Sequence, residues 1–383
     1  MNLVSAIRVS RSPLAAFATM GLYWGAFAAQ VPVFKAQTGA NDAGFGLLML
    51  CSSLGLVTAM WLAPRLEERA GRWALPLCAL SLLVLFLGPG AVENPAAFGV
   101  AMMLVGVGSG MTDVVMNARV SALEARHGRS LMNLNHAAFS LAYAISAAAT
   151  GIAREAGLGP VAVFSVCAVF SSMLVPVMRG CVPRSAEEPQ TTGTGRLPAT
   201  LVLLGGMIVL IAFATEAGIE GWSALHVERT LGGGGAEGAF GPAVLGLTMG
   251  IGRLTGQIVA HHLDETRVIL WAVVLSASGA MIAALAPAVM VAYLGFGVLG
   301  LGVSVIAPMT LALVGRIATD RQRTVIIART SVIGFVGFFI APLMMGTISE
   351  AFGLRWSFVA VALLLGIVPT ILFRLSRFDR RRV

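Results

Sequence analysis

The middle of the chain reads PVAVFSVCAVFSSMLVPVM at residues 160–178, RGCVPRSAEEPQTTGTGRLP at 179–198 and ATLVLLGGMIVLIAFATEAGIEGW at 199–222. Each outer segment is apolar and close to the roughly 20 residues that a helix needs to cross a bilayer. The segment between them is rich in Arg, Glu, Thr and Gly, a composition that belongs in water. The stretch therefore predicts two membrane-spanning helices joined by a linker outside the membrane.

The composition of the whole chain agrees with a membrane protein. Of its 383 residues, 57% are hydrophobic and 11% are charged, and the mean hydropathy is +0.87. A water-soluble globule of this size would lack the polar residues to cover its surface. The net charge of +8 does not indicate a nucleic-acid partner, because the arginines are spread over many short segments instead of one patch.

The apolar pattern recurs along the whole chain. We predict an all-α membrane protein with twelve transmembrane helices in two pseudo-symmetric six-helix bundles, at residues 1–178 and 199–383, with a cytoplasmic linker at 179–198. The predicted helices span 14–34, 45–63, 73–88, 96–118, 133–153, 160–178, 199–222, 240–261, 268–286, 288–314, 325–348 and 356–373. The first resembles a signal peptide, but eleven similar segments follow it, so we interpret it as an uncleaved helix.

The basic residues orient these helices. Clusters such as Arg65 to Arg72 and Arg374 to Arg382 fall in alternate gaps, and the opposite gaps hold only Lys35, Arg154, Arg229 and Arg355. By the positive-inside rule, the arginine-rich gaps and both termini are cytoplasmic.

A weak internal repeat relates the two halves. Gly151-Ile-Ala-Arg-Glu155 is similar to Gly346-Thr-Ile-Ser-Glu350, and Gly106-Val-Gly108 is similar to Gly300-Leu-Gly302. Each pair falls in the corresponding helix of its half. The matches indicate a duplication, which is how many secondary transporters are built.

The segment pattern resembles the major facilitator superfamily, and the resemblance covers essentially the whole chain. The loop Pro64-Arg-Leu-Glu-Glu-Arg-Ala-Gly-Arg72 is a degraded form of the Gly-x3-Asp-Arg-x-Gly-Arg loop of that family. The resemblance implies a gating role for Glu68, Arg69 and Arg72. It also implies a monomer that works by alternating access.

Four further motifs look like the fucose permease side of the superfamily, and especially its YbjJ-like inner-membrane branch. They are Leu22-Tyr-Trp-Gly25, Asp113-Val-Val-Met-Asn117, His136-Ala-Ala-Phe-Ser140 and Gly252-Arg-Leu-Thr-Gly256. This branch implies a bacterial inner-membrane location and a transport mode, but no substrate.

Two carboxylates stand out in the apolar segment 199–222. An ionisable group in the membrane costs about 2.5–3.5 kcal/mol, so it is a functional candidate by default. Glu216 and Glu220 are four residues apart and share one helix face. Desolvation and mutual repulsion favour uptake of a proton by one of them, so we predict that they couple transport to protons. A structural hydrogen bond for Glu216 is the alternative.

Other polar residues in the segments are weaker candidates. Asp113 and Asn117 share a face, and we predict proton coupling for Asp113 and solute binding for Asn117. His136 is a further proton-coupling candidate, as a pH-sensitive gate or as a polar link to Asp113. Arg253 is too deep to reach water easily and needs a carboxylate, carbonyl groups or an anionic solute; a structural partner is favoured.

Aromatic and amide side chains provide the predicted solute-binding surface. Tyr23, Trp24 and Gln30, together with Tyr143 and Trp222, could stack on and hydrogen-bond a sugar or another small polar ring. An aromatic belt at the membrane surface is the alternative for Trp222.

Several motifs do not indicate a site. Gly295-Phe-Gly-Val-Leu-Gly300 matches GxGxxG, but no strand precedes it, so we interpret it as a packing surface. His261 and His262 are adjacent and lack further ligands for a metal. No Walker motif occurs. We therefore expect no enzyme activity, cofactor or metal.

The resulting prediction is a secondary active transporter that moves a small polar solute, a sugar among the candidates, by symport with protons. Sodium coupling stays open, since a carboxylate and a few neutral oxygens suit either ion. A proton-driven exporter of amphipathic compounds is one alternative. A non-transporting membrane sensor or lipid-handling protein is another.

Overall fold

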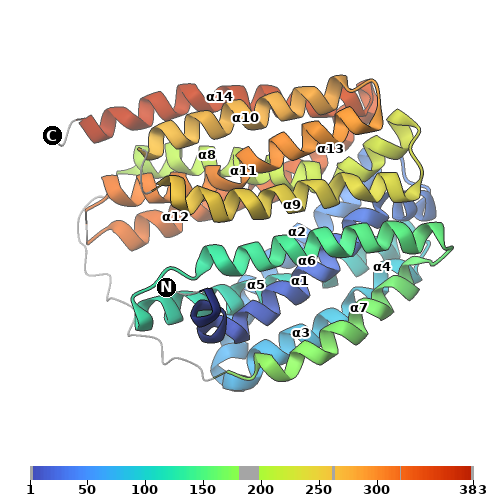
Figure 1. Cartoon of the computed structure of the whole chain (residues 1–383), viewed down its shortest axis with the longest axis horizontal. Helices are drawn as coiled ribbons and strands as arrows, with labels where there is room; N and C mark the ends of the chain where they lie inside the picture. The colour runs from blue at the N-terminus through green and yellow to red at the C-terminus, as the bar shows by residue number, and fades with distance from the viewer. Residues whose placement is uncertain (1–2, 181–197, 261–263, 320, 381–383) are drawn as a thin grey trace.

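The computed structural model describes residues 3–180, 198–260, 264–319 and 321–380, which form a bundle of long helices (Figure 1). The predicted linker at 179–198 and the pair His261 and His262 fall largely outside these residues. The helices are α1 (Leu3–Thr38), α2 (Asp42–Ala70), α3 (Ala74–Leu85), α4 (Leu87–Ala91), α5 (Pro95–His127), α6 (Met132–Glu155), α7 (Pro160–Leu174), α8 (Ala199–Leu225), α9 (Gly235–Ala260), α10 (Glu265–Leu285), α11 (Val289–Ile317), α12 (Arg323–Phe335), α13 (Gly337–Phe352) and α14 (Leu354–Arg380). Two 3₁₀ turns, Gly71–Trp73 and Val175–Met178, and a π turn, His226–Thr230, complete them.

Local sequence explains where these helices begin. Asn41 caps α2 by accepting a hydrogen bond from the Gly44 amide at 2.8 Å. Asn94 caps α5 in the same way, and Pro95 takes the first helical position, where a missing N–H costs nothing. Pro160 likewise opens α7.

The described helices accommodate the twelve predicted segments. Ten runs in the described chain are long and apolar enough to cross a membrane. One of them, Asp42–Ala91, folds back at Gly71–Trp73 and contains two predicted segments, and α9 holds another. The eleventh segment is divided between α12 and α13. The chain is therefore an all-α membrane protein.

Several helices are longer than predicted. The segment expected to end at residue 118 continues as α5 to His127. The first residue after position 118 with a left-handed backbone conformation is Gly128, at φ 61°, and the helix ends there. Arg119 thus lies inside a helix and is 4% exposed, instead of lying in a polar gap.

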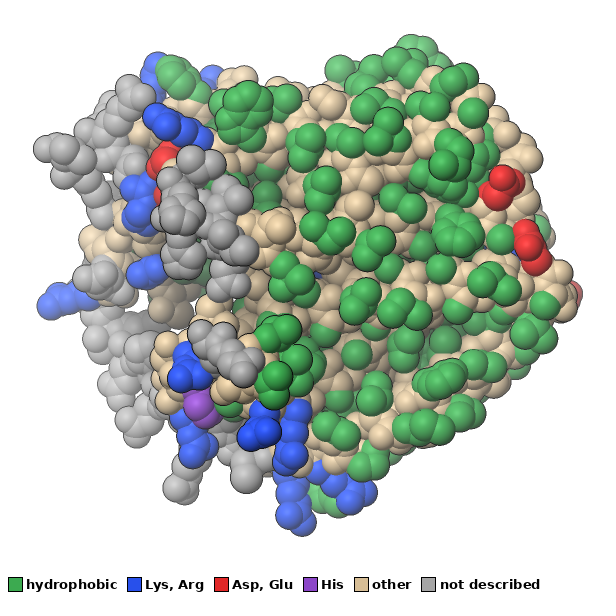
Figure 2. All heavy atoms as spheres, in the orientation of Figure 1, with side chains coloured by type: hydrophobic (Ala, Val, Ile, Leu, Met, Phe, Trp, Pro, Cys, Tyr) green, Lys and Arg blue, Asp and Glu red, His purple; other side chains and the backbone are tan. Residues whose placement is uncertain are grey.

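The two ends of the bundle differ in charge. Both termini and most Lys and Arg side chains lie at one end, which we call the basic end (Figures 1 and 2). At the opposite end, the Gln37 amide nitrogen donates to the carbonyl oxygen of Val92, so the end of α1 lies beside the end of α4. We call this the Asp42 end, after the first residue of α2.

Helices α1–α7 and α8–α14 meet along two seams. In one, Gly46 of α2 lies so close to α13 that an added Cβ would be 2.3 Å from the Pro342 carbonyl oxygen. In the other, an added Cβ on Gly151 of α6 would be 2.7 Å from Cβ of Ala239 in α9. Small residues allow this approach, which replaces the hydrophobic driving force that lipid abolishes.

One of the two quoted pairs of the internal repeat, Gly151 and Gly346, lies at these seams. Gly346 of α13 packs against the backbone of Asp42 in α2, as Gly151 packs against α9. Gly106 and Gly300 also have equivalent places, since each lies against a neighbouring helix of its own group, at Ser52 and at Leu245. Gly295 and Gly300 of the GxGxxG motif are packing positions in α11, as predicted.

Candidate functional site

The predicted carboxylate Glu216 forms an ion pair inside the bundle. Arg253 Nη2 of α9 donates to Glu216 Oε1 of α8 at 2.9 Å, and Arg253 Nη1 donates to Ser140 Oγ of α6 at 2.5 Å. The two charged side chains are 13% and 16% exposed. Because Ser140 belongs to the other helix group, Arg253 ties the two groups together at this depth. A carboxylate partner for Arg253 is what its apolar setting required.

A second carboxylate lies beside this pair without a base of its own. Glu220 is one turn beyond Glu216 on α8, and it forms no hydrogen bond or ion pair within the described part of the chain. The charges that act on it are those of Glu216 and Arg253. Both carboxylates also act on Tyr143, which is 1% exposed and has no partner for its hydroxyl in the structure. We call these four residues, together with Ser140, the Glu216 cluster.

One face of α6 builds the other wall of this cluster. Ser140 and Tyr143 are one turn apart, and α9 approaches them through glycines. An added Cβ on Gly246 would be 2.6 Å from the Tyr143 ring, and one on Gly250 would be 3.2 Å from Ser140 Cβ. Larger residues at these positions would push Arg253 away from Ser140.

Asp113, Asn117 and His136 lie apart from the ion pair. The Asn117 amide donates to both Oδ1 and the carbonyl oxygen of Asp113, each at 2.9 Å, so these two α5 residues partner each other. His136 packs edge-on against Phe17, with ring centroids 4.8 Å apart, and not against Asp113. Arg253 is the charge that acts on His136.

The predicted solute-binding residues of α1 are mainly packed among other side chains. Tyr23 is buried and stacks on Phe86 at 4.9 Å between centroids. Trp24 is half-buried and meets the same Phe86 edge-on at 5.5 Å. Gln30 is fully buried, and neither polar atom of its side chain has a hydrogen-bond partner in the structure.

Trp222 is not part of an aromatic belt. It is 1% exposed and meets Phe45 of α2 edge-on at 6.1 Å, so it contributes to the contact between the two helix groups. Trp356, at the start of α14, is 58% exposed and keeps the surface position that a belt requires.

The loop that resembles the family signature uses a different carboxylate from the expected one. Glu68, Arg69 and Arg72 are exposed. The adjacent Glu67 instead accepts hydrogen bonds from Arg119 of α5 at 3.1 and 3.2 Å. Arg119 also donates to the carbonyl oxygen of Gly71 at 2.8 Å. The connection after α2 is therefore held to α5 within the first helix group.

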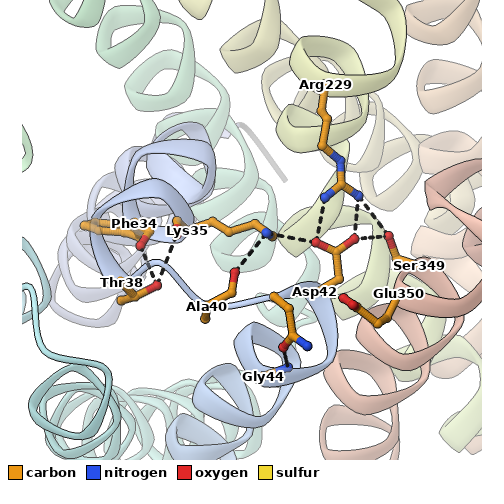
Figure 3. Close-up of polar contacts among 10 residues, drawn as sticks. Phe34, Lys35, Thr38, Ala40, Asp42, Gly44, Arg229, Ser349 and Glu350 are labelled. Carbon is orange, nitrogen blue, oxygen red and sulfur yellow. Dashed lines mark hydrogen bonds and ion pairs between the residues drawn. The ribbon is translucent and has the colours of Figure 1, made fainter.

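A network of charged residues closes the Asp42 end, and sequence reasoning did not find it (Figure 3). Asp42 accepts from Lys35 at 2.9 Å, from both terminal nitrogens of Arg229 at 2.6 and 2.5 Å, and from the Ser349 hydroxyl. The Asp42 amide donates to Glu350 Oε2 at 2.8 Å. This Asp42 network joins α1 and α2 to the end of α8 and to α13.

A second ion pair closes the same end on the α6 side. Arg154 Nη1 and Nη2 donate to the two carboxylate oxygens of Glu228 at 2.7 and 3.0 Å. Arg154 also donates to the carbonyl oxygens of Ala29 and Gly235, at 2.7 and 3.3 Å. The side chains of this Arg154–Glu228 pair are 11% and 19% exposed.

The sequence held one indication of these contacts. Lys35, Arg154 and Arg229 are three of the four basic residues that break the positive-inside pattern. Each forms an ion pair at the Asp42 end. The basic residues that fall outside the arginine-rich gaps of the sequence therefore marked this site.

Comparison with known proteins identifies the family. A protein-family sequence model described as Major Facilitator Superfamily matches residues 206–383. An uncharacterized MFS-type transporter from Yersinia pestis is 30% identical over 351 residues, which cover 91% of each protein. The chain belongs to the Major Facilitator Superfamily, whose members are transporters.

Solved structures agree with this fold. A bacterial homolog of the human lysosomal transporter Spinster, in an inward-facing and occupied conformation, has a TM-score of 0.75 and 14% identity, with 97% of each chain covered. A D-xylose-proton symporter has a TM-score of 0.73 and 14% identity, with 95% of this chain and 97% of that chain covered. At these identities the likeness concerns the fold alone.

Proposed function

We propose that the protein is a secondary active transporter that carries a small polar solute by alternating access, in symport with protons. The observation that carries this proposal is the charge count of the Glu216 cluster, where Arg253 pairs with Glu216 and leaves the neighbouring Glu220 without an ion pair in the part of the chain that the structure describes. A buried cluster with a surplus negative charge gains stability when it takes up a cation. Glu216 and Glu220 are therefore the proposed proton-coupling residues, and Asp113 and His136 are secondary candidates.

Proton uptake at Glu216 would act on the contact between the helix groups. Charged Glu216 holds one terminal nitrogen of Arg253 while the other donates to Ser140. A neutral Glu216 loses its attraction for the arginine, since charge-assisted hydrogen bonds are about twice as strong as neutral ones. Loss of that attraction frees Arg253 to bind a solute or to leave Ser140, and either step links protonation to movement.

The solute is proposed to be uncharged and polar. Within the Glu216 cluster, the Tyr143 hydroxyl and the Glu220 carboxylate offer hydrogen-bonding groups without partners in the described chain. Such groups suit the hydroxyls of a sugar. The fold is also that of a protein described as a D-xylose-proton symporter, which makes sugars the first class to test. Asn117, Trp24 and Trp222 remain proposed contributors.

The proposed topology places the basic end in the cytoplasm and the Asp42 end outside a bacterial inner membrane. The arginine bias supports this orientation. The proposed halves are residues 1–178 and 199–383, with 179–198 as a cytoplasmic linker. The Asp42 end is closed by ion pairs in the structure, so the proposed state faces the cytoplasm.

Thermal unfolding of the purified protein tests this proposal. Sugars, organic acids, vitamins and amphipathic drugs are added at two pH values to the wild type and to Glu216→Gln. A ligand at a hundredfold its Kd stabilises the folded state by about 2.7 kcal/mol, which raises the Tm. We expect one polar solute to raise it in a pH-dependent manner that is lost in the variant. Shifts with amphipathic drugs or lipids alone would contradict the proposal and favour export or lipid handling.

A further inference from the structure

The end of α8 carries two adjacent residues of opposite charge that bind different helices. Glu228 and Arg229 lie in the π turn His226–Thr230. Glu228 pairs with Arg154 of α6, and Arg229 pairs with Asp42 of α2. Both partners belong to the first helix group. We infer that this turn is a latch that holds the Asp42 end closed, and that α8 connects the latch to the Glu216 cluster.

The Arg154–Glu228 half of the latch is the more deeply buried. Its arginine satisfies two carboxylate oxygens and two backbone carbonyls, one from each helix group. On its other side, Glu228 packs closely against α9. An added Cβ on Gly238 of α9 would be 2.1 Å from Glu228 Oε1. The Glu228 carboxylate therefore lies between α9 on one side and Arg154 on the other.

The Arg229 half is more exposed and is shared among several groups. The Arg229 side chain is 41% exposed, whereas Asp42 is 6% exposed. Asp42 keeps Lys35 and Ser349 as partners when Arg229 is removed. Neutralising Arg229 is therefore expected to have a smaller effect than neutralising Glu228.

The order of Glu228 and Arg229 along the chain determines which ion pairs can form in the closed state. A rotation of the turn that exchanged the two residues would place Arg229 beside Arg154 and Glu228 beside Asp42. Both contacts would be repulsive, and like charges in contact disfavour a competing arrangement. The closed end therefore has one favourable pairing.

The π turn is bonded to the second helix group. Single π turns occur often at functional sites, because the additional residue changes which way the following side chains point. His226 is fully buried in this turn, and its Nε2 lies 3.0 Å from the carbonyl oxygen of Ala283 in α10. This contact fixes the turn to its own group. Separation of the groups at this turn therefore breaks the two ion pairs.

One helix connects the latch to the proposed coupling residues. Glu216 and Glu228 are twelve residues apart, about 18 Å along the helical axis. Their opposing contacts both come from α6, where Ser140 faces Arg253 and Arg154 faces Glu228. Movement of α6 away from α8 and α9 breaks both contacts. The latch depends on the proposed function only in requiring that the Asp42 end opens.

Cysteine labelling tests the latch without knowledge of the solute. Ala243 is 6% exposed and packs in the α6–α9 seam with Ala147 and Ala239. The four native cysteines are replaced by alanine, and Ala243→Cys is labelled with a water-soluble maleimide in detergent. The rate is compared in Glu228→Gln, in Arg229→Gln and in the exchange Arg154→Glu with Glu228→Arg. Glu93→Gln is the control, since Glu93 is an exposed acid between α4 and α5, at the same end.

We expect Glu228→Gln to be labelled about tenfold faster, Arg229→Gln less than that, and the control at the original rate. The charge exchange should be labelled more slowly than Glu228→Gln, because it restores opposite charges, but it does not restore the hydrogen bonds from position 154 to Ala29 and Gly235. An unchanged rate in Glu228→Gln would overturn the latch. If Glu228→Gln unfolds, Arg154→Met decides: labelling faster than in the control supports the latch, and labelling at the control rate contradicts it. Neither result depends on proton coupling or on the solute.

Discussion

The Asp42 end and the Glu216 cluster both join the two helix groups through arginines, but their charges are balanced differently. At the Asp42 end, Arg154 pairs with Glu228, Lys35 and Arg229 share Asp42, and Glu350 accepts from the Asp42 amide, so three bases meet three carboxylates. In the Glu216 cluster, the one arginine pairs with Glu216, and Glu220 has no ion pair within the described residues. The first arrangement is complete as it stands, whereas the second lacks one positive charge.

This difference in charge balance predicts different roles for the two regions. A network whose charges are balanced gains nothing from binding a further ion. It suits a contact that forms in one state of the protein and breaks in another. An unbalanced cluster in an apolar setting favours a bound proton or sodium ion. We therefore expect substitutions at the Asp42 end to change the stability of the closed state, and substitutions in the Glu216 cluster to change coupling.

The largest expected effect is on coupling, in Glu216→Gln. Glutamine keeps the size of the side chain and a hydrogen bond to Arg253 but cannot take up a proton. With a solute found by thermal shift, accumulation driven by a pH gradient in proteoliposomes should fall at least about tenfold, while exchange of solute without a gradient persists. Glu237→Gln, at an exposed acid of α9, is the control. Accumulation that is unchanged in Glu216→Gln would remove this residue from coupling.

The next effect concerns the stability of the closed Asp42 end. Arg154→Met keeps the length of the side chain and leaves Glu228 buried without a base. Breaking a buried pair from one side typically costs about 3–5 kcal/mol, and the partial exposure here lowers the expectation to about 2–3 kcal/mol. Thermal unfolding in detergent measures the loss. A change below about 0.5 kcal/mol, the range of ordinary surface substitutions, would show that the pair contributes little.

Crowding at the α2–α13 seam should also weaken the closed Asp42 end, but by less than Arg154→Met does. An added Cβ on Gly346 would be 2.5 Å from the backbone oxygen of Asp42, so Gly346→Ala requires α2 and α13 to separate. When Gly346→Ala is combined with Ala243→Cys, the maleimide should label the cysteine at position 243 faster. Gly366→Ala in α14 is the matched control, because nothing lies within 4 Å of its added Cβ. Equal labelling in the two variants would mean that the α2–α13 seam does not limit opening.

The smallest effects distinguish two adjacent acids at the basic end. Glu67→Gln weakens the contact with the buried Arg119 and should cost about 1–2 kcal/mol of stability. Glu68→Gln removes an exposed charge and should change stability by less than about 0.5 kcal/mol. Paired thermal unfolding curves compare them. The reverse order would restore Glu68 to the gating role that the family resemblance implied.

The sequence predicted the parts of the structure that depend on local chemistry. Hydropathy indicates the helices, Asn41 and Pro95 mark where two of them begin, and the cost of burying Glu216 and Arg253 marked both as residues that need partners. Arg119 was misplaced because nothing before Gly128 breaks its helix.

Contacts between distant residues could not be predicted in the same way. Asp42 and Arg229 are 187 residues apart, and their pairing depends on how the two helix groups meet. Trp222 lies at a helix end where a belt residue would lie, and only its contact with Phe45 shows that it faces the other group. The unequal charge balance of the two regions follows from these contacts and is visible only in the structure.

The pH dependence of Ala243→Cys labelling tests most directly whether the Glu216 cluster controls the Asp42 end. The same cysteine background is used for the wild-type cluster, for Glu216→Gln and for Glu228→Gln. We predict faster labelling as the pH falls, because a proton taken up by the proposed coupling pair Glu216 and Glu220 lowers the negative charge that holds Arg253, and with it the contact to Ser140. Glu216→Gln should remove this dependence, and Glu228→Gln should raise the rate at every pH. A pH dependence that persists in Glu216→Gln would contradict the account.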